Sequence, residues 1–442
     1  YYEADNEEFK ELIEAYSGSK DDEKLKEMRE AWKNLYGSLF KWIVLSGVIG
    51  SLIGLIASGF SYAIVWVTSF RQANPMIILG LPLGGLLIVW LYKITGQEKN
   101  SGTNLVLTVV RSDEEEVPGW VTPLILISTA ITHLFGGSSG REGAALQFGA
   151  SVGNVCAKYL HLNESDKKII ILASMSAAFS ALFGTPMAAV VFPMEVISVG
   201  VMYYAALVPC VFSAFAAQGI ALLLKVRTVT PPYLVESVPN FYSVDSIKAI
   251  ILAIACALAG ALFCIVLHNG EHYLKKWFPN PYVRVVVGAA GVIILYFALR
   301  TDAYLGLGTG VIQASFKETV GPQMFLLKML FTALTLCAGF KGGEIVPSLF
   351  IGATLGSFMS TILAAPTDIC AACGMVGVFC SVTNSPITSL LIAAELFGFN
   401  GMPFYCIVVA VSYLLSGYYS LYKEQKIVYS KTENKYVDKH TK

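Results

Sequence analysis

The stretch Gly136-Gly137-Ser138-Ser139-Gly140-Arg141-Glu142-Gly143, followed by an apolar run from Ala144, decides how this sequence is interpreted. Its glycines break the chain, and the apolar run predicts a helix directly after the break. The first N–H groups of a helix have no partner within it and the helix dipole is positive there, so this break attracts an anion. We expect the Glu142 carboxylate, in the first turn, to occupy that anion site and to leave it on protonation. The alternative is a plain negatively charged helix cap. The predicted anion-binding residues beside it are Gly140, Arg141 and Gly143.

The composition places this break inside a membrane. Of the 442 residues, 55% are hydrophobic and 14% are charged, whereas soluble domains carry about 25% charged residues. No charged residue occurs in 42–70, 169–194, 196–224 or 396–422, and a span needs roughly 20 apolar residues. Small soluble, fibrous and disordered proteins are therefore excluded. Lys and Arg number 31, as do Asp and Glu, so the balance of charge points to no nucleic-acid partner.

The chain also repeats itself. Pro186 and Glu195 bracket eight residues, as Pro386 and Glu395 do 200 residues later. At an offset of 203, four residues of the first half align without gaps on four of the second: Gly140, Gly149, Ala150 and Gly153 on Gly343, Gly352, Ala353 and Gly356. Short, interrupted apolar segments at matching positions of two halves indicate a transport site. We therefore predict a duplicated all-α membrane transporter whose halves are inverted.

Two further motifs are candidates for the same anion site. Gly342-Gly343-Glu344-Ile345-Val346-Pro347 opens the matching helix of the second half, so Gly343, Ile345 and Val346 join the predicted anion-binding residues. Glu344 is a second acid near the expected path, or else a cap at an aqueous rim that Lys341 neutralises. In Ser101-Gly102-Thr103-Asn104, hydroxyl and amide groups can donate hydrogen bonds to an anion, although the same residues are ordinary helix caps.

The expected organisation has five parts. Residues 1–40 form a helical segment, 41–225 the first membrane repeat, 226–245 a linker, 246–422 the second repeat, and 423–442 a basic tail. Basic flanks stay in the cytoplasm, so both ends are expected there and the protein is expected in the cell membrane. No cleavable signal peptide is visible. Neither a cofactor nor a metal site is expected.

Other polar residues have two interpretations each. Glu195 and Glu395 are proton relays or interfacial caps that pair with basic residues. His133 and His161 titrate near the site or bond a neighbouring helix. Cys370 and Cys373 have redox or zinc-like spacing, but without a second pair small apolar helix residues are the favoured interpretation.

Taken together, these motifs resemble the CLC family of chloride channels and anion/proton exchangers, from about Trp42 to Tyr422. Gly140-Arg141-Glu142-Gly143 is similar to the family's gating-glutamate motif, with Ala144 in place of the usual Pro. Gly342 to Pro347 is similar to its second anion loop, and Ser101 to Asn104 stands where the family has its anion-binding serine. The resemblance implies that Tyr419 coordinates the central anion, with Tyr418 and Tyr422 as alternatives. It also implies a homodimer with one pore in each subunit.

The departures from the family pattern resemble its bacterial fluoride/proton antiporter branch. Val196 stands where chloride/proton exchangers carry their inner proton glutamate, and Glu344-Ile345 replaces Ile-Phe. Fluoride is small and strongly hydrated, so stripping its water requires strong donors, such as a protonated carboxylic acid. Glu142 and Glu344 offer two acids, which favours fluoride export in exchange for protons.

Two alternatives stay open at the level of the sequence. The first is a chloride-selective channel or chloride/proton exchanger. The second, remote one is an intramembrane serine protease that uses the Gly-x-Ser-Gly pattern at 137–140, with His268 as its base. A purely structural scaffold does not explain four acids in apolar surroundings.

Overall fold

A computed structural model describes residues 22–112, 116–226 and 233–441 of the chain. The first 21 residues of the expected helical segment and residues 227–232 of the expected linker lie outside this part. The chain divides into two compact units, Tyr1–Leu45 and Ser46–Lys442, and helix α2 (Asp22–Ala73) includes residues of both. The expected boundary at residue 40 stays a prediction. The candidate site lies in the unit from Ser46 onward.

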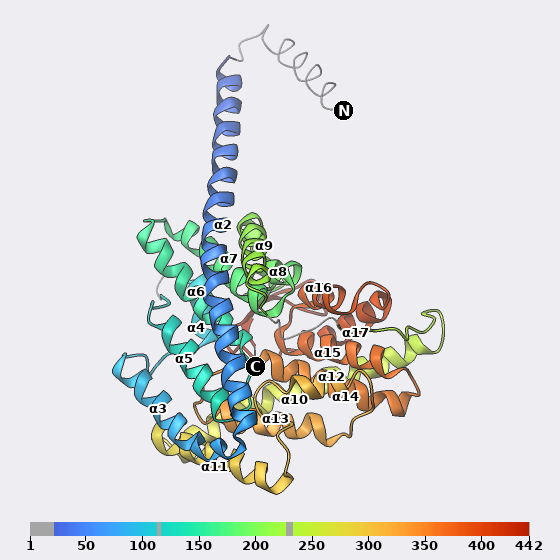
Figure 1. Ribbon diagram of the computed structural model, residues 1–442. Coiled ribbons are helices and arrows are strands. Elements are labelled where there is room, and N and C mark those ends of the chain that lie inside the picture. The colour runs from blue at the N-terminus through green and yellow to red at the C-terminus, as the bar shows by residue number, and fades with distance from the viewer. Residues whose placement is uncertain (1–21, 113–115, 227–232, 442) are drawn as a thin grey trace. The chain divides into compact units, whose positions relative to one another are not determined.

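Helices make up most of this unit, and each half contributes its own set (Figure 1). After α2 the first half contains η1 (Pro75–Gly80), α3 (Leu81–Ile94), α4 (Thr103–Arg111), α5 (Val121–Leu134), α6 (Glu142–Tyr159), α7 (Glu164–Phe183), α8 (Pro186–Val196), η2 (Tyr204–Ala206) and α9 (Leu207–Leu223). The second half contains α10 (Asp245–Trp277), α11 (Pro281–Leu299), α12 (Thr309–Ala314), α13 (Gln323–Leu336), α14 (Ile345–Leu363), α15 (Thr367–Thr383), α16 (Pro386–Phe397) and α17 (Met402–Leu415).

Many of these helices are too short to cross a bilayer alone. Within the described residues, six helical stretches are long and apolar enough to span it, and six more apolar helices have 10 to 17 residues. Broken helices survive in hydrocarbon only where their free backbone groups face protein or water. The short helices α8, α15 and α16 are accordingly lined with buried residues. This confirms the predicted architecture of interrupted membrane helices.

The repeat predicted from the sequence appears in the backbone. Helix α7 ends at Gly184 with φ of 80°, and α15 ends at Asn384 with φ of 56°. Glycine and asparagine tolerate this left-handed conformation better than other residues do. Two positions later, Pro186 and Pro386 open α8 and α16, where a missing N–H costs nothing. The two turns therefore follow one plan, 200 residues apart.

The aligned glycines serve the same purpose in both halves. A methyl group at Gly149 would lie 2.7 Å from the Ser174 carbonyl of α7, and one at Gly352 would lie 2.4 Å from the Gly374 carbonyl of α15. Only glycine allows the helix backbones to approach this closely. The glycines thus join α6 to α7 and α14 to α15 in matching fashion.

The predicted basic tail is a folded part of the molecule. Strands β2 (Lys426–Tyr429) and β3 (Tyr436–His440) form an antiparallel hairpin, and β2 pairs in parallel with β1 (Ser198–Val199), which follows α8. The sheet order is β1-β2-β3. The tail is therefore attached to the first half directly after α8, where Gln425 contacts Val196 across 229 residues of sequence.

Candidate functional site

The two glycine breaks meet face to face. Gly140 N donates to Gly343 O at 2.6 Å, and Gly343 N donates to Gly140 O at 2.8 Å. Helix α6 begins two residues after the first glycine, and α14 begins two residues after the second. Two helix N-termini, one from each half, therefore start from a single backbone bridge. Because each helix start is positive, their shared neighbourhood favours negative charge.

The contact between the breaks leaves no room for side chains at its glycines. A methyl group at Gly343 would lie 2.5 Å from Gly143 N and 3.3 Å from Glu142 N. One at Gly143 would lie 2.8 Å from Gly343 Cα and 3.2 Å from Glu344 Oε2. The structure thus brings together the first acid, the second acid and the glycines that the sequence singled out from each half.

Glu142 is fully buried at the first position of α6. Its Oε2 accepts a hydrogen bond from Arg141 N at 3.1 Å, so the carboxylate lies against an N–H group of the helix start. Its Oε1 has no hydrogen-bond partner among the described residues. The carboxylate therefore lies at the positive start of α6 with one oxygen free of hydrogen bonds.

Arg141 supports the loop rather than facing an open site. Its Nη1 donates to Ser61 Oγ at 2.7 Å, its Nη2 donates to the Leu182 carbonyl at 3.2 Å, and its Nε lies 3.6 Å from Glu142 Oε1. The guanidinium therefore links α2, α7 and the first acid. We expect its charge to hold Glu142 in place, since Arg stays protonated in proteins.

Tyr422 interacts electrostatically with the second acid, Glu344. Its side chain is fully buried, and its hydroxyl has no hydrogen-bond partner among the described residues. Tyr419, the residue named by resemblance, is half-buried and accepts a hydrogen bond from Asn384 Nδ2 through its carbonyl. Of the three candidate tyrosines, Tyr422 is the one whose hydroxyl is buried and makes no hydrogen bond in the described part of the chain.

The motif Ser101 to Asn104 lies at the start of α4, and its side chains are partly engaged. Ser101 is exposed. Thr103 Oγ1 accepts a hydrogen bond from Gln147 Nε2 at 3.4 Å, and Gln147 belongs to α6. A methyl group at Gly102 would also touch Gln147, at 3.3 Å from Nε2. Gln147 was not anticipated from the sequence, although it lies five residues after Glu142 on the same helix.

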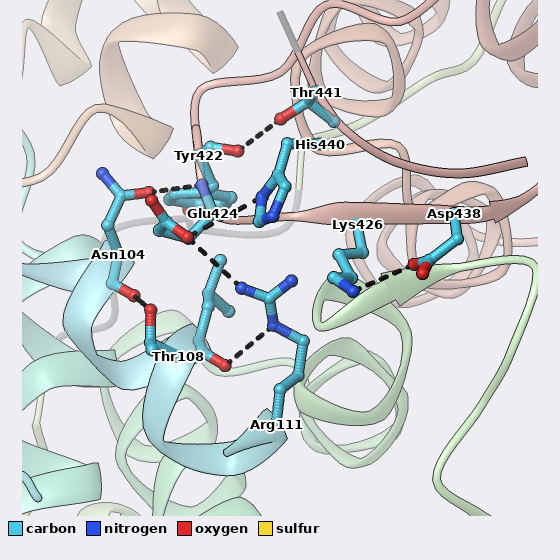
Figure 2. A network of polar contacts seen from close by, with 10 residues as sticks. Asn104, Thr108, Arg111, Tyr422, Glu424, Lys426, Asp438, His440 and Thr441 are labelled. Carbon is cyan, nitrogen blue, oxygen red and sulfur yellow. Dashed lines mark hydrogen bonds and ion pairs between the residues drawn. The ribbon is translucent and has the colours of Figure 1, made fainter. Parts of the chain in front are cut away.

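A polar network joins this motif to the C-terminal hairpin (Figure 2). Asn104 Oδ1 accepts a hydrogen bond from Glu424 N at 3.2 Å. The Glu424 carboxylate lies 3.4 Å from Arg111 Nη2 at the end of α4 and 3.7 Å from His440 Nδ1 on β3. Thr441 Oγ1 donates to the Tyr422 carbonyl at 2.7 Å, as Figure 2 shows. The network therefore fixes the segment that carries Tyr422 between α4 and the hairpin.

Glu195 and Glu395 cap each other's helix rather than pairing with basic residues. Glu395 accepts hydrogen bonds from Met187 N and Ala188 N, both at 2.9 Å, at the start of α8. Glu195 accepts from Ile387 N at 3.0 Å and from Thr388 N at 2.9 Å, at the start of α16. Each acid thus satisfies orphan N–H groups of the partner helix. The interpretation as caps is the one that the contacts favour, with backbone N–H groups as partners.

The remaining candidates lie apart from one another. His133 is buried and His161 is exposed. Ser139, the serine of the Gly-x-Ser-Gly pattern, makes no side-chain hydrogen bond among the described residues, and His268 Nε2 lies 3.4 Å from the Leu421 carbonyl, so the two do not form a serine–histidine pair. Cys370 and Cys373 are buried free thiols. In the described part of the chain, no group of His, Cys, Asp and Glu side chains is arranged to hold a metal ion.

These features define a membrane protein of two related halves with opposed helix starts at its centre. The sequence profile of the voltage gated chloride channel family matches residues 84–417, and the chain belongs to this family. It is therefore a multi-pass membrane protein with the CLC fold and a CLC-family anion/proton transporter. Membership argues against the intramembrane protease.

Several known proteins are similar over most of the chain. A "Chloride/fluoride channel protein" of Pseudomonas syringae pv. tomato is 34% identical over 399 residues, which cover 88% of this chain and 87% of the relative. The solved structure of a CLC-type fluoride/proton antiporter is 33% identical, with a TM-score of 0.85, and covers 88% of this chain and 98% of the neighbour. A cyanobacterial Cl⁻/H⁺ antiporter structure, at 18% identity and a TM-score of 0.73, shares the fold.

Proposed function

We propose that this protein exchanges fluoride for protons across the cell membrane and so exports fluoride. The observation that carries the proposal is the paired helix start, where a buried glutamate from the first half and a second glutamate from the other half adjoin one backbone bridge. The similarity to a fluoride/proton antiporter and to a chloride/fluoride channel protein supports fluoride as the anion.

Glu142 is the proposed gate and proton carrier. While ionised, its carboxylate occupies the N–H groups at the start of α6, where it accepts from Arg141 N. Protonation removes the negative charge, so the attraction to the positive helix start falls and a fluoride ion replaces the carboxylate. The protonated side chain then moves away from the helix start and carries its proton in one direction, while the fluoride ion moves in the other. One residue therefore prevents the two ions from passing independently.

Glu344 and Tyr422 are the proposed fluoride donors. A protonated carboxylic acid and a phenol each carry an O–H group, and short O–H bonds to an anion are among the stronger hydrogen bonds in proteins. The unpaired Tyr422 hydroxyl and the nearby Glu344 side chain supply this chemistry at the start of α14. The apolar pair that the family usually carries there offers no such donor.

The proposal is tested in proteoliposomes with fluoride and proton electrodes recording together. The wild-type protein should move protons against fluoride at a fixed ratio, and fluoride flux should exceed chloride flux by more than tenfold. Glu142→Gln should abolish proton movement. Glu116→Gln is the matched control, because Glu116 is a half-exposed acid paired with Lys158 and should leave the ratio unchanged. Coupled transport by the Glu142→Gln protein would exclude Glu142 as the proton carrier, and equal halide fluxes would favour the chloride exchanger.

Two further features rest on the resemblance to the family. We infer that the protein is a homodimer with a pore in each subunit, and that both chain ends lie in the cytoplasm. The basic residues of the tail, which flank the last helix, support the cytoplasmic placement.

A further inference from the structure

Three basic side chains converge on the loop between α11 and α12. Arg71 comes from the last turn of α2, His133 from the last turn of α5, and Lys328 from α13. Arg71 is 6% exposed, and the other two are fully buried. Lys328 Nζ donates to the carbonyls of Tyr304 at 3.1 Å and Gly306 at 2.8 Å, so this lysine holds the loop.

Arg71 and His133 both face the same backbone position. A methyl group at Gly306 would lie 3.3 Å from Arg71 Nη2 and 3.4 Å from His133 Nδ1. Gly306 has a φ of 55°, which favours glycine, so the loop approaches the two side chains closely. Arg71 Nε and both ring nitrogens of His133 have no hydrogen-bond partner in the described residues. The buried guanidinium and imidazole therefore both lie beside Gly306, each with a nitrogen that makes no hydrogen bond among the described residues, and the imidazole is also within reach of the Gly140 backbone.

Charge at this place is not balanced within the described chain. Among the described residues no ion pair joins Arg71 or Lys328 to a carboxylate, and Asp302 interacts with Arg71 only at longer range. A buried charge without a partner is costly, and a buried polar group without a hydrogen bond is costly as well. An anion bound here would reduce both costs.

Arg71 also lines a pocket of about 300 Å³ that is open at its exposed rim. Tyr296, Arg300, Thr301 and Asp302 form other parts of its wall. On the far side, Gly306 N donates to the Gly137 carbonyl at 3.1 Å, and Gly137 belongs to the break that leads to Glu142. A methyl group at Gly136 would lie 3.5 Å from Arg71 Cδ. The basic cluster therefore stands between the pocket and the loop of the proposed gate.

We propose that Arg71 and His133 form a separate binding subsite for a small monovalent anion, between this pocket and the Gly136–Glu142 loop. The inference rests on the proposed transport of fluoride, which would be the anion held there. Arg71 supplies charge and N–H donors, and a neutral His133 supplies one N–H in either tautomer. Lys328 positions the loop and adds positive potential. The subsite recruits the anion from water before it reaches the helix starts, or receives it on the way out.

The experiment measures how fluoride flux depends on the fluoride concentration at the pocket side, in oriented proteoliposomes. Arg71→Gln should raise the half-saturating concentration roughly tenfold, the size expected for a lost hydrogen bond to a charged group. His133→Leu should act in the same direction. The fluoride-to-proton ratio should stay at its wild-type value in both variants, because Glu142 is untouched.

Arg300→Gln is the matched control. Arg300 lines the same pocket but is exposed, so losing its charge should change half-saturation less than twofold. Arg71→Lys keeps the positive charge and serves as a conservative second variant. Gel filtration in detergent shows whether each variant is folded. Unchanged half-saturation in both Arg71→Gln and His133→Leu would overturn the subsite. If the wild type instead carries chloride without protons, the proposed function of fluoride export is wrong. A tenfold shift in half-saturation measured with chloride would still support the subsite.

Discussion

At the scale of single residues, the meeting of the two breaks depends on the absence of side chains. Gly140 and Gly343 exchange both backbone hydrogen bonds, and the next glycine, Gly143, packs on the same bridge. A single methyl group there forces the backbones apart. The geometry of both helix starts therefore depends on the lack of a side chain at all three glycines.

Gly343→Ala should reduce transport at least tenfold while the protein still folds. The added methyl group would lie 2.5 Å from Gly143 N, so the bridge must open by several tenths of an ångström and both helix starts shift. Flux in proteoliposomes is the measurement. Gly59→Ala is the control, since nothing lies within 4 Å of that position in α2. Full activity of Gly343→Ala would show that transport does not need the close bridge.

Tyr422→Phe and Tyr419→Phe form a second matched pair at this scale. Removing the buried, unpaired Tyr422 hydroxyl should weaken fluoride binding about tenfold, whereas the half-buried Tyr419 should tolerate the change. Fluoride binding is measured by isothermal titration of the detergent-solubilised protein. The opposite order of effects would return the role to Tyr419, as the motif alone implies.

At the scale of elements, the crossed caps between α8 and α16 join the two halves. Each helix opens with a proline and carries, in its last turn, a glutamate that accepts hydrogen bonds from the start of the other helix. The sequence disclosed the matching spacing of these residues. It did not disclose that each acid reaches across to the other repeat, because one-dimensional spacing carries no information about which helix ends lie together.

Glu395→Ala should lower stability by about 1–2 kcal/mol, since two N–H groups of α8 lose their acceptor. Glu395→Gln keeps one acceptor oxygen and should lose less. Thermal unfolding in detergent is the measurement, with the fluoride-to-proton ratio recorded on the same proteins. A changed ratio at unchanged stability would assign Glu395 to the proton path instead.

The C-terminal hairpin makes a pH-dependent contribution through Lys431. Its Nζ donates to the Tyr413 carbonyl at 2.9 Å and to Ser416 Oγ at 3.0 Å, and burial lowers the pKa of Lys431 from 10.5 to about 8. Below pH 8 the lysine is protonated in both the folded and unfolded states, so the cost of burying its charge is fully present. Between pH 8 and 10.5 the unfolded state binds more protons, and stability therefore rises with pH.

The difference in Tm between the wild type and Lys431→Met isolates this effect. The Tm of the wild type should rise relative to that of Lys431→Met as the pH is raised from 7.5 to about 10, because the unfolded state binds more protons in this range. The shared titration of other groups cancels in the difference. A difference that moves the other way would mean that the charged lysine is the form that the hairpin prefers.

At the scale of the whole molecule, the sequence predicted the class and the duplication but not where the C-terminal tail packs. Composition and the repeat offsets of 200 and 203 residues were sufficient to predict interrupted membrane helices in two halves, because hydrophobic length and glycine packing are local properties. Gln147, the pair Arg71 and His133, and the role of Tyr422 depend on contacts between distant segments. From the sequence the tail is only a basic segment, but in the structure β2 pairs with β1 and Gln425 donates to the carbonyl at the end of α8.

The homodimer that the resemblance implies is a prediction for the whole protein. Light scattering of the purified protein in detergent, corrected for the bound detergent, should give twice the chain mass of 47.8 kDa. Single-molecule bleaching in a bilayer should show two steps per spot. A single step at all protein densities would leave one chain as the complete transporter.

The contact between the tail and the first half also sets the order of folding during synthesis. Gln425 Nε2 donates to the Val196 carbonyl at the end of α8, yet 229 residues separate them. At 5–20 residues per second, roughly 10 to 50 seconds pass before the partner of that carbonyl has been made. The first half must therefore wait in the bilayer until this segment has been made, and a chain that ends before Gln425 lacks the donor for the Val196 carbonyl.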